Sequence, residues 1–257
     1  MSAENAEGLI LRVTDFSETS RIVVLFTRQF GKISALAKGG RRLKGPFESA
    51  LDLLATCQIV FLSKNTSGLD LLTEAKLIQR FRPLERDLNC LYAGYYVAEL
   101  LLGLTEDYDP HVHLYSAAQE ALESFSVDGM CRLGILRFEL MVLREIGQLP
   151  DFEMCVACGS DLTCEKTLRV SISLGGLICP DCRPGEQGHD LQKIEFETTA
   201  VLRFLSGDDE QPRRTAQLWQ LSSLFHRENP AMLANEIGRA QRLNSSHTVL
   251  SRMPSSA

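Results

Sequence analysis

The sequence contains no apolar run long enough to span a bilayer, and its first residues, MSAENAEG, carry two acids and no basic residue. A transmembrane helix needs about 20 apolar residues, and a secretory signal begins with a basic region. We therefore predict a cytoplasmic protein without a membrane anchor. Hydrophobic content of 44% and charged content of 23% agree with this, because both are ordinary for a soluble globular chain of one to two domains.

The signature motifs of common enzyme classes are also missing. There is no Walker A loop, no G-x-S-x-G, no H-E-x-x-H, and no G-x-G-x-x-G after a predicted strand. The segment GKISALAKGG superficially resembles a phosphate loop, but it lacks the Gly-Lys-Ser/Thr ending and a following helix. We therefore predict that the protein is not an enzyme and has no catalytic residues. The alternative is a metalloenzyme with an unrecognised site.

One absence is local: residues 19–47 contain no Asp or Glu, although the formal net charge of the chain is -6. The same stretch holds seven cations, which are Arg21, Arg28, Lys32, Lys38, Arg41, Arg42 and Lys44. Residues 1–80 carry 11 basic and 8 acidic residues, whereas the remainder carries 16 basic and 25 acidic residues. A basic surface on an acidic protein predicts a polyanionic partner. The alternative is a solvated basic face without a partner.

The first 80 residues alternate short β-rich segments with turns. We predict strands at residues 8–15, 21–27, 32–38 and 57–63, and a strand or the start of a helix at 70–80. Four to five short strands with tight turns indicate a small β-barrel or sandwich. A five-stranded OB-type barrel fits the count and the length, and an SH3-like barrel fits nearly as well.

After Pro83 the apolar residues recur at helical spacing, which predicts a helical bundle and, for the whole chain, an α+β fold. The first apolar series is Leu88, Leu91, Tyr92, Tyr95, Tyr96 and Leu100. The predicted helices lie within residues 84–107, 111–125, 129–147, 197–205 and 215–226. Asp109 before Pro110 is a candidate N-cap of the second helix.

Two histidines lie near the start of that second helix. His111 and His113 are two residues apart, so their side chains do not face each other on a helix. We therefore predict surface positions for both and no shared metal.

Five of the eight cysteines fall within 28 residues, which in a reducing cytoplasm favours a metal site over disulfides. Cys155-x-x-Cys158 and Cys179-x-x-Cys182 are separated by 20 residues, including a predicted hairpin with its turn at Gly175–Gly176. Two such pairs predict a tetrahedral four-sulfur site for one zinc ion. Four thiolates leave no open position, so we predict a structural zinc. A thioredoxin-like redox pair is the alternative, but it lacks the surrounding βαβ pattern.

The other cysteines have no ligand spacing. We interpret Cys164 as a spare thiol, since it has no partner two residues away. Cys57, Cys90 and Cys131 stand among apolar neighbours, which is typical of small buried side chains.

Three segments together resemble the RecO family of bacterial DNA repair proteins. They are GLILRVTDFSETSRIVVLFTRQFGKISALAKGGRR, GLDLLTEAKLIQRFRPLERDLNCLYAGYYVAELL, and the Cys155/Cys158 pair with SISLGGLICPDC. The resemblance covers about residues 8–226 and implies an OB-fold followed by a helical domain with a zinc-ribbon-like insertion. We accordingly place the OB-fold at 1–82, the helical domain at 83–150 and 191–233, and the zinc module at 151–190.

The resemblance also implies a function in recombination. RecO-like proteins bind single- and double-stranded DNA and anneal complementary strands. With RecR they help load RecA recombinase onto DNA coated by single-stranded DNA-binding protein, whose acidic C-terminal tail they contact through the helical domain. Some relatives lack the four cysteines, so the zinc is expected to be scaffolding. The alternative function is an RNA- or ribosome-associated zinc-ribbon protein.

Annealing needs no active-site residue, because a basic surface that screens phosphate repulsion is sufficient. We predict phosphate contacts by the seven cations of residues 19–47, although Arg21 opens a buried strand. Phe30 and Phe47 are predicted either to stack on bases or to plug the barrel.

The last segment, residues 234–257, departs from the family pattern and has no clear helical period. We expect it to be unstructured. From Glu236 it resembles translated sequencing-adapter sequence, which gives the hypothesis that it is not native after about Ala234. The alternative is a genuine disordered tail.

Overall fold

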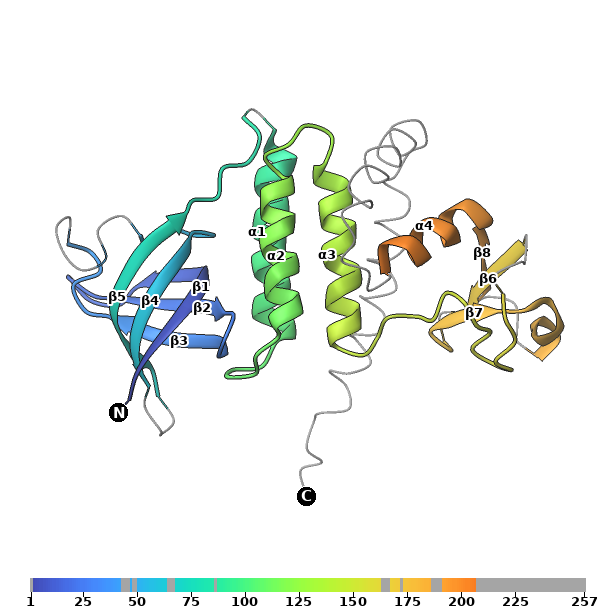
Figure 1. Ribbon diagram of the computed structural model, residues 1–257, viewed down its shortest axis with the longest axis horizontal. Coiled ribbons are helices and arrows are strands. Elements are labelled where there is room, and N and C mark those ends of the chain that lie inside the picture. The colour runs from blue at the N-terminus through green and yellow to red at the C-terminus, as the bar shows by residue number, and fades with distance from the viewer. Residues whose placement is uncertain are drawn as a thin grey trace, which may run out of the picture. The chain divides into compact units, whose positions relative to one another are not determined.

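The computed structural model describes residues 2–42, 47, 50–63, 68–85, 87–162, 167–171, 173–185 and 191–206. The fold is α+β, as predicted, and the chain divides into two compact units, Met1–Gly147 and Gln148–Ala257. The first unit contains a β-barrel and three helices, and the second contains a small sheet and a further helix (Figure 1). Among the described residues, no helix combines the length and apolarity needed to cross a membrane.

The barrel has five strands that close in the order β1-β2-β3-β5-β4. Their bounds are β1 Ser2–Asp15, β2 Arg21–Thr27, β3 Gly31–Ala37, β4 Thr56–Ser63 and β5 Asp70–Gln79. All pairs are antiparallel except β3 with β5, where Ala35 lies opposite Asp70. This order is that of an OB barrel, so it decides against the SH3-like alternative. It also shows that residues 70–79 form a strand.

Strand β3 shows how the sequence builds the barrel wall. Its burial alternates strictly, with Ile33, Ala35 and Ala37 inside and Lys32 and Ser34 partly exposed. Side chains of a strand point alternately to its two faces, so the apolar residues fill the interior. The seven-residue strands β2 and β3 differ little from prediction. Strand β1 begins six residues earlier than predicted and pairs along β4 from Ser2 onwards.

Three helices follow the barrel. They are α1 Leu88–Leu104, α2 Val112–Ser124 and α3 Cys131–Glu145, each within the predicted range. Asp87 caps α1 by accepting a hydrogen bond from the Asn89 backbone N–H at 2.9 Å. The predicted cap of α2 is wrong, because α2 begins only after His111 and receives no side-chain cap. The Asp109 carboxylate instead contacts His111 Nε2 at 3.3 Å.

Helix α1 buries a different face from the one that revealed it in the sequence. The exposed fractions of Leu88, Tyr92 and Tyr95 are 63%, 60% and 40%, although these residues belong to the apolar series. The buried face consists of smaller or intervening residues, namely Cys90, Ala93, Gly94, Val97, Ala98 and Leu101. Small side chains let neighbouring segments approach closely. A Cβ on Gly94 would lie 2.5 Å from the ring of Phe81.

The barrel and the helices of the first unit share one apolar core. Leu9, Leu11 and Phe26 of the barrel belong to the same buried cluster as Val97 of α1 and Tyr115 of α2. The rings of Phe26 and Tyr115 are 6.1 Å apart, and the Tyr115 hydroxyl donates to Glu7 Oε1 at 3.1 Å. A polar contact inside an apolar interface fixes the position of α2 against the barrel.

The second unit is built around a three-stranded sheet in the order β7-β6-β8. Its elements are β6 Thr167–Ser171, β7 Gly176–Ile178, the 3₁₀ helix η1 Pro180–Gly185, β8 Leu191–Glu195 and α4 Phe196–Ser206. Arg203 of α4 donates to the carbonyl oxygens of Phe152 at 2.6 Å and Leu162 at 3.1 Å. These bonds tie the helix to the cysteine-bearing loop. The helix predicted at residues 215–226 lies outside the described residues, as does the tail after 234.

Candidate nucleic-acid interface and metal centre

The seven predicted cations occupy three different environments. Arg21 and Arg41 both contact the Asp15 carboxylate, with nitrogen–oxygen distances of 3.1 and 3.6 Å. Arg41 also donates to the carbonyl of Ser17 at 3.1 Å. These two arginines therefore stabilise the loop between β1 and β2. The single negative charge of Asp15 offsets half of their combined positive charge.

Arg28 and Lys32 instead contact the helices. Arg28 donates to Ser116 Oγ at 3.2 Å and lies 6.0 Å from the ring centroid of Tyr115. Lys32 Nζ donates to the carbonyls of Leu102 at 2.9 Å and Thr105 at 2.6 Å. Only 13% of the Lys32 side chain is exposed. Because the last carbonyls of a helix have no partner within it, Lys32 acts as a cap for the C-terminus of α1.

Replacing Lys32 with Met is expected to lower the free energy of unfolding by about 1–3 kcal/mol, because two partly buried carbonyls lose a charged donor. The affinity of the folded protein for single-stranded DNA should stay within about twofold. Denaturant unfolding and fluorescence anisotropy measure the two quantities. Lys38→Met is the control and should leave stability unchanged. Weaker DNA binding by Lys32→Met at unchanged stability would return Lys32 to the interface.

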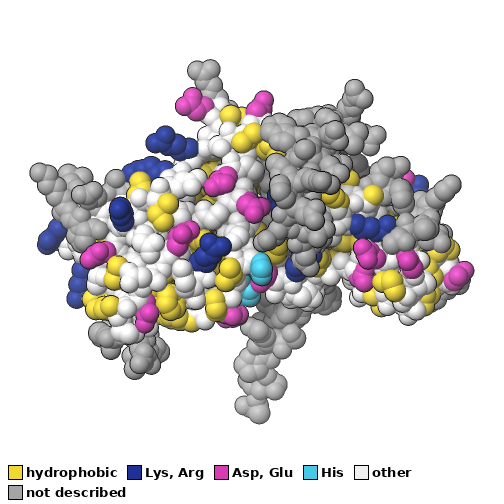
Figure 2. Space-filling view, viewed as in Figure 1, with side chains coloured by type: hydrophobic (Ala, Val, Ile, Leu, Met, Phe, Trp, Pro, Cys, Tyr) yellow, Lys and Arg dark blue, Asp and Glu magenta, His cyan; other side chains and the backbone are white. Residues whose placement is uncertain are grey.

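Lys38 and Arg42 are exposed on the turn that follows β3. Neither side chain makes a hydrogen bond or an ion pair within the part of the chain that the structure describes. Lys44 lies outside the described residues. On the face shown in Figure 2, the barrel carries separate Lys and Arg side chains among acidic and apolar ones. The surface available to a polyanion is therefore smaller than the seven-residue set.

The predicted aromatic residues are mostly part of the barrel. Phe47 is 3% exposed and belongs to the barrel core, so it is a plug and is not available for stacking. Phe30 is half-buried, with its ring 5.4 Å from that of Phe61 in an edge-to-face arrangement. Phe16, in the connection between β1 and β2, is by contrast 61% exposed. The sequence signal that could have identified it is a single phenylalanine in the otherwise polar segment DFSETS.

Arg12 is a second residue that sequence reasoning missed. It is exposed on β1, opposite Val24 of β2, and lies outside the acid-free stretch. Strand alternation does not predict its exposure, because Leu9, Ile10 and Leu11 are all buried and the pairing with β2 shifts register between Ile10 and Arg12. A search by charge runs alone does not find such isolated cations.

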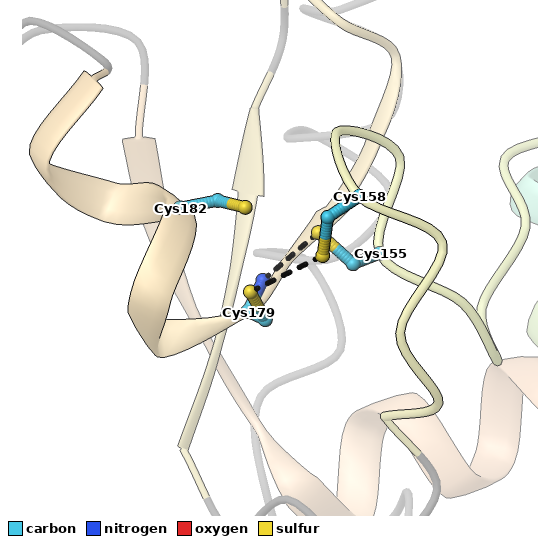
Figure 3. A group of neighbouring side chains, drawn as sticks. All are labelled: Cys155, Cys158, Cys179 and Cys182. Atoms are coloured by element: carbon cyan, nitrogen blue, oxygen red, sulfur yellow. Dashed lines mark hydrogen bonds between the residues drawn. The ribbon is translucent and has the colours of Figure 1, made fainter.

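The four predicted cysteines come together in the second unit. Their sulfur atoms all lie within 4.8 Å of one another, and the Cys158 and Cys179 sulfurs are 3.7 Å apart (Figure 3). A tetrahedral zinc site with metal–sulfur bonds of about 2.3 Å has sulfur–sulfur distances of about 3.8 Å. The donor set and its spacing therefore fit a divalent ion. This cluster can hold a metal.

Local backbone geometry brings the two pairs together. Gly159 follows the first pair with φ +72°, and its N–H donates to the Cys155 carbonyl at 2.8 Å. A left-handed residue is favourable for glycine, so the first knuckle turns as predicted. The second pair stands at the end of β7 and in η1, after a turn at Gly175 with φ +67°.

Three cysteines of the cluster have pKa values that are shifted in different directions. Burial raises the pKa of Cys155, but N–H donors from Cys179, Cys158 and Ala157 outweigh it and hold the pKa at about 6. Hydrogen bonds to Ser160 lower the pKa of Cys158. Hydrogen bonds with the sulfurs of Cys179 and Cys158 raise the pKa of Cys182 to about 12. The cluster thus shares its remaining protons, which a cation would displace.

The remaining cysteines and histidines do not extend this centre. Burial raises the pKa of Cys57 to about 11 and that of Cys131 to about 12, as expected for inert thiols. Cys131 is only half-buried, and Cys164 lies outside the described residues. His113 is exposed as predicted. His111 is not a plain surface residue, since its Nδ1 lies 2.7 Å from Glu145 Oε2.

Comparison with known proteins agrees with this architecture. The domain described as "Recombination protein O N terminal" matches residues 1–81, and "Recombination protein O C terminal" matches residues 85–225. The chain belongs to the RecO family. A RecO protein of Rhodopirellula baltica, named "DNA repair protein RecO", is 44% identical over 210 residues, which cover 81% of this chain and 77% of the relative.

Two further RecO relatives carry the same name. One from Anaeromyxobacter sp. (strain Fw109-5) is 32% identical over 179 residues, or 69% of each chain. One from Symbiobacterium thermophilum is 29% identical over 245 residues, or 94% of each chain. The resemblance seen in three sequence segments is thus confirmed at the level of the family, and the family is one of DNA repair proteins.

Proposed function

We propose that this RecO-family protein is a non-enzymatic recombination mediator that binds single- and double-stranded DNA and anneals complementary strands. The observation that carries the proposal is a pair of exposed cations, Lys38 and Arg42, without side-chain partners among the described residues, on an OB barrel. OB barrels commonly bind oligonucleotides. Cations free of acidic partners can contact phosphates without first breaking an ion pair.

The mechanism needs charge and shape and no bond-making residue. Two complementary strands repel each other through their phosphates, and a basic surface reduces this repulsion while it leaves the bases free to pair. Arg21 and Arg41 contribute to the field near the loop, but Asp15 offsets part of it. Lys32 holds α1 instead, so we remove it from the proposed phosphate contacts.

The metal cluster is proposed to hold one structural zinc ion through Cys155, Cys158, Cys179 and Cys182. Zinc takes four thiolates at tetrahedral spacing, and four protein ligands leave no position for a substrate. The ion would supply a cross-link between the two turns of the second unit. The cysteines orient the loop and η1 around it, and no chemical step passes through it.

The proposed partners follow from the family. We propose that the protein acts with RecR to help load RecA onto single strands coated by single-stranded DNA-binding protein, in the cytoplasm at the nucleoid. The helical domain is proposed to bind the acidic C-terminal tail of the coat protein. We propose that residues 1–82 bind DNA, that residues 83–150 and 191–233 contact the protein partners, and that residues 151–190 hold the zinc ion.

Replacing both Lys38 and Arg42 with Ala tests the interface. Each lost phosphate contact should flatten the dependence of log K on log salt by about 0.7 for single strands, so the double variant should lose about 1.4. Affinity and strand-annealing rate at low salt should both fall.

The control changes two exposed arginines of α3, Arg132 and Arg137, to Ala, which removes the same charge elsewhere. It should keep the wild-type slope for naked DNA. An unchanged slope in the Lys38/Arg42 variant would remove the turn after β3 from the interface. Stronger binding of RNA than of DNA would favour the ribosome-associated alternative.

A further inference from the structure

Phe16 is presented to solvent by a loop that is closed by its own hydrogen bonds. The residue is 61% exposed and lies in the connection between β1 and β2. The backbone N–H groups of Phe16 and Ser17 both donate to the Ser20 carbonyl, at 3.0 and 3.3 Å. The Ser20 N–H donates to Ser17 Oγ at 3.2 Å. These hydrogen bonds fix the loop that carries Phe16, so less loop entropy is lost when a planar partner packs on the ring.

The loop is joined to the basic turn after β3. The Arg41 N–H donates to the Thr19 carbonyl at 3.2 Å, and Arg41 Nη1 donates to the Ser17 carbonyl at 3.1 Å. Lys38 and Arg42, the cations with no side-chain partner among the described residues, stand on that same turn. Phe16 and the two proposed phosphate contacts therefore belong to one continuous surface.

The acids of the loop decide what kind of group can approach Phe16. Asp15 is occupied by Arg21 and Arg41, whereas Glu18 is exposed two residues after Phe16. A carboxylate disfavours a phosphate at the loop tip but does not repel an uncharged base. Phosphates are therefore favoured on the Lys38–Arg42 side, and the base is favoured on the Phe16 side.

We propose that Phe16 stacks on an unpaired base of the single strand whose phosphates contact Lys38 and Arg42. The proposal rests on the proposed function and adds a reason for preferring single strands to duplexes. Every base has a π-face, so stacking on an aromatic ring tolerates any sequence. In a duplex the bases are already stacked on each other, and the ring gains no partner.

Phe16→Ala tests the proposal in the full chain. Affinity for a single-stranded oligonucleotide should fall at least about fivefold, which corresponds to about 1 kcal/mol, the lower end for base–aromatic stacking. The salt slope should stay unchanged, because no phosphate contact is lost. Duplex affinity should also stay unchanged. Phe16→Trp should restore single-strand binding.

An oligonucleotide of abasic sites separates stacking from loop rigidity. Wild type and Phe16→Ala should bind it equally, since it offers no base.

Tyr92→Ala is the matched control, because it removes an equally exposed aromatic side chain from α1, and it should bind single strands like wild type. If Phe16→Ala loses as much affinity for abasic strands as for normal strands, the stacking proposal is wrong. If Phe16→Ala binds single strands like wild type while the Lys38/Arg42 variant binds weakly, the stacking proposal is wrong but the proposed function stands. Wild-type binding by both variants would remove this surface altogether.

Discussion

Replacing Cys179 with Ser is expected to abolish metal binding and unfold the small sheet of the second unit. Cys179 is 5% exposed, its sulfur lies 3.7 Å from that of Cys158, and its N–H donates to Cys155 Sγ at 3.3 Å. Structural zinc contributes about 10–16 kcal/mol of apparent binding energy in small modules. The apolar core of this sheet is small, with Leu168, Leu177 and Ile178 at its centre. The sheet therefore has little other stabilising energy to offset the loss of the metal ion.

Metal content per chain and amide-exchange protection of β6, β7 and β8 measure this effect. Cys131→Ser is the matched control, because it removes a half-buried thiol outside the cluster and should keep one metal per chain. The barrel belongs to the other compact unit, so single-strand affinity of Cys179→Ser should change little. One tightly bound zinc in Cys179→Ser would contradict the assignment of this cysteine as a ligand.

Replacing Gly31 with Ala is expected to destabilise the first unit by about 3 kcal/mol or more. Gly31 has φ +66°, which costs a residue with a Cβ about 1–2 kcal/mol. An added Cβ would also lie 2.0 Å from the carbonyl oxygen of Asp109 and 2.8 Å from its nitrogen. Backbone atoms cannot rotate away as a side chain can, so the turn between β2 and β3 and the segment before α2 must separate.

Gly147→Ala is the control that isolates the energetic cost of the left-handed backbone conformation. Gly147 has a similar φ of +69°, but apart from its chain neighbours no described residue lies within 4 Å of the position of an added Cβ. Its loss of stability in denaturant unfolding should be about 1–2 kcal/mol, clearly smaller than that of Gly31→Ala. Equal losses in the two variants would show that the contact with Asp109 does not restrain the barrel.

The elements of the barrel and of the metal cluster were predictable because their signals are local. β-Branched composition located β2 and strand alternation located β3 almost to the residue, and two C-x-x-C pairs with a hairpin between them predicted four converging sulfurs. A knuckle or a strand depends on neighbouring residues and on glycine conformations that the sequence displays. The choice between an OB and an SH3-like barrel was not local, because it depends on the pairing of β3 with β5.

Helix faces show the limit of pattern recognition. The apolar series of α1 revealed a helix, but Leu88 and Tyr92 turned out to be exposed, and Ala93 and Gly94 face the core. A helical period shows which residues share a face, but it does not show which face meets a neighbour. Close packing selects here the face with small residues, where Phe81 and Leu54 approach Gly94.

The amino-acid sequence by itself determined a basic, acid-free stretch in a strand-rich segment, a helical segment and a four-cysteine motif, because each depends on composition and short spacing. Only the tertiary structure decided which cations of that stretch remain available. Lys32 and the Leu102 carbonyl that it binds are 70 residues apart, and Arg28 and Ser116 are 88 apart. A long basic side chain binds whichever acceptors folding brings within reach. Lys38 and Arg42 have no side-chain partner among the described residues, so they are the cations that we propose for phosphate contacts.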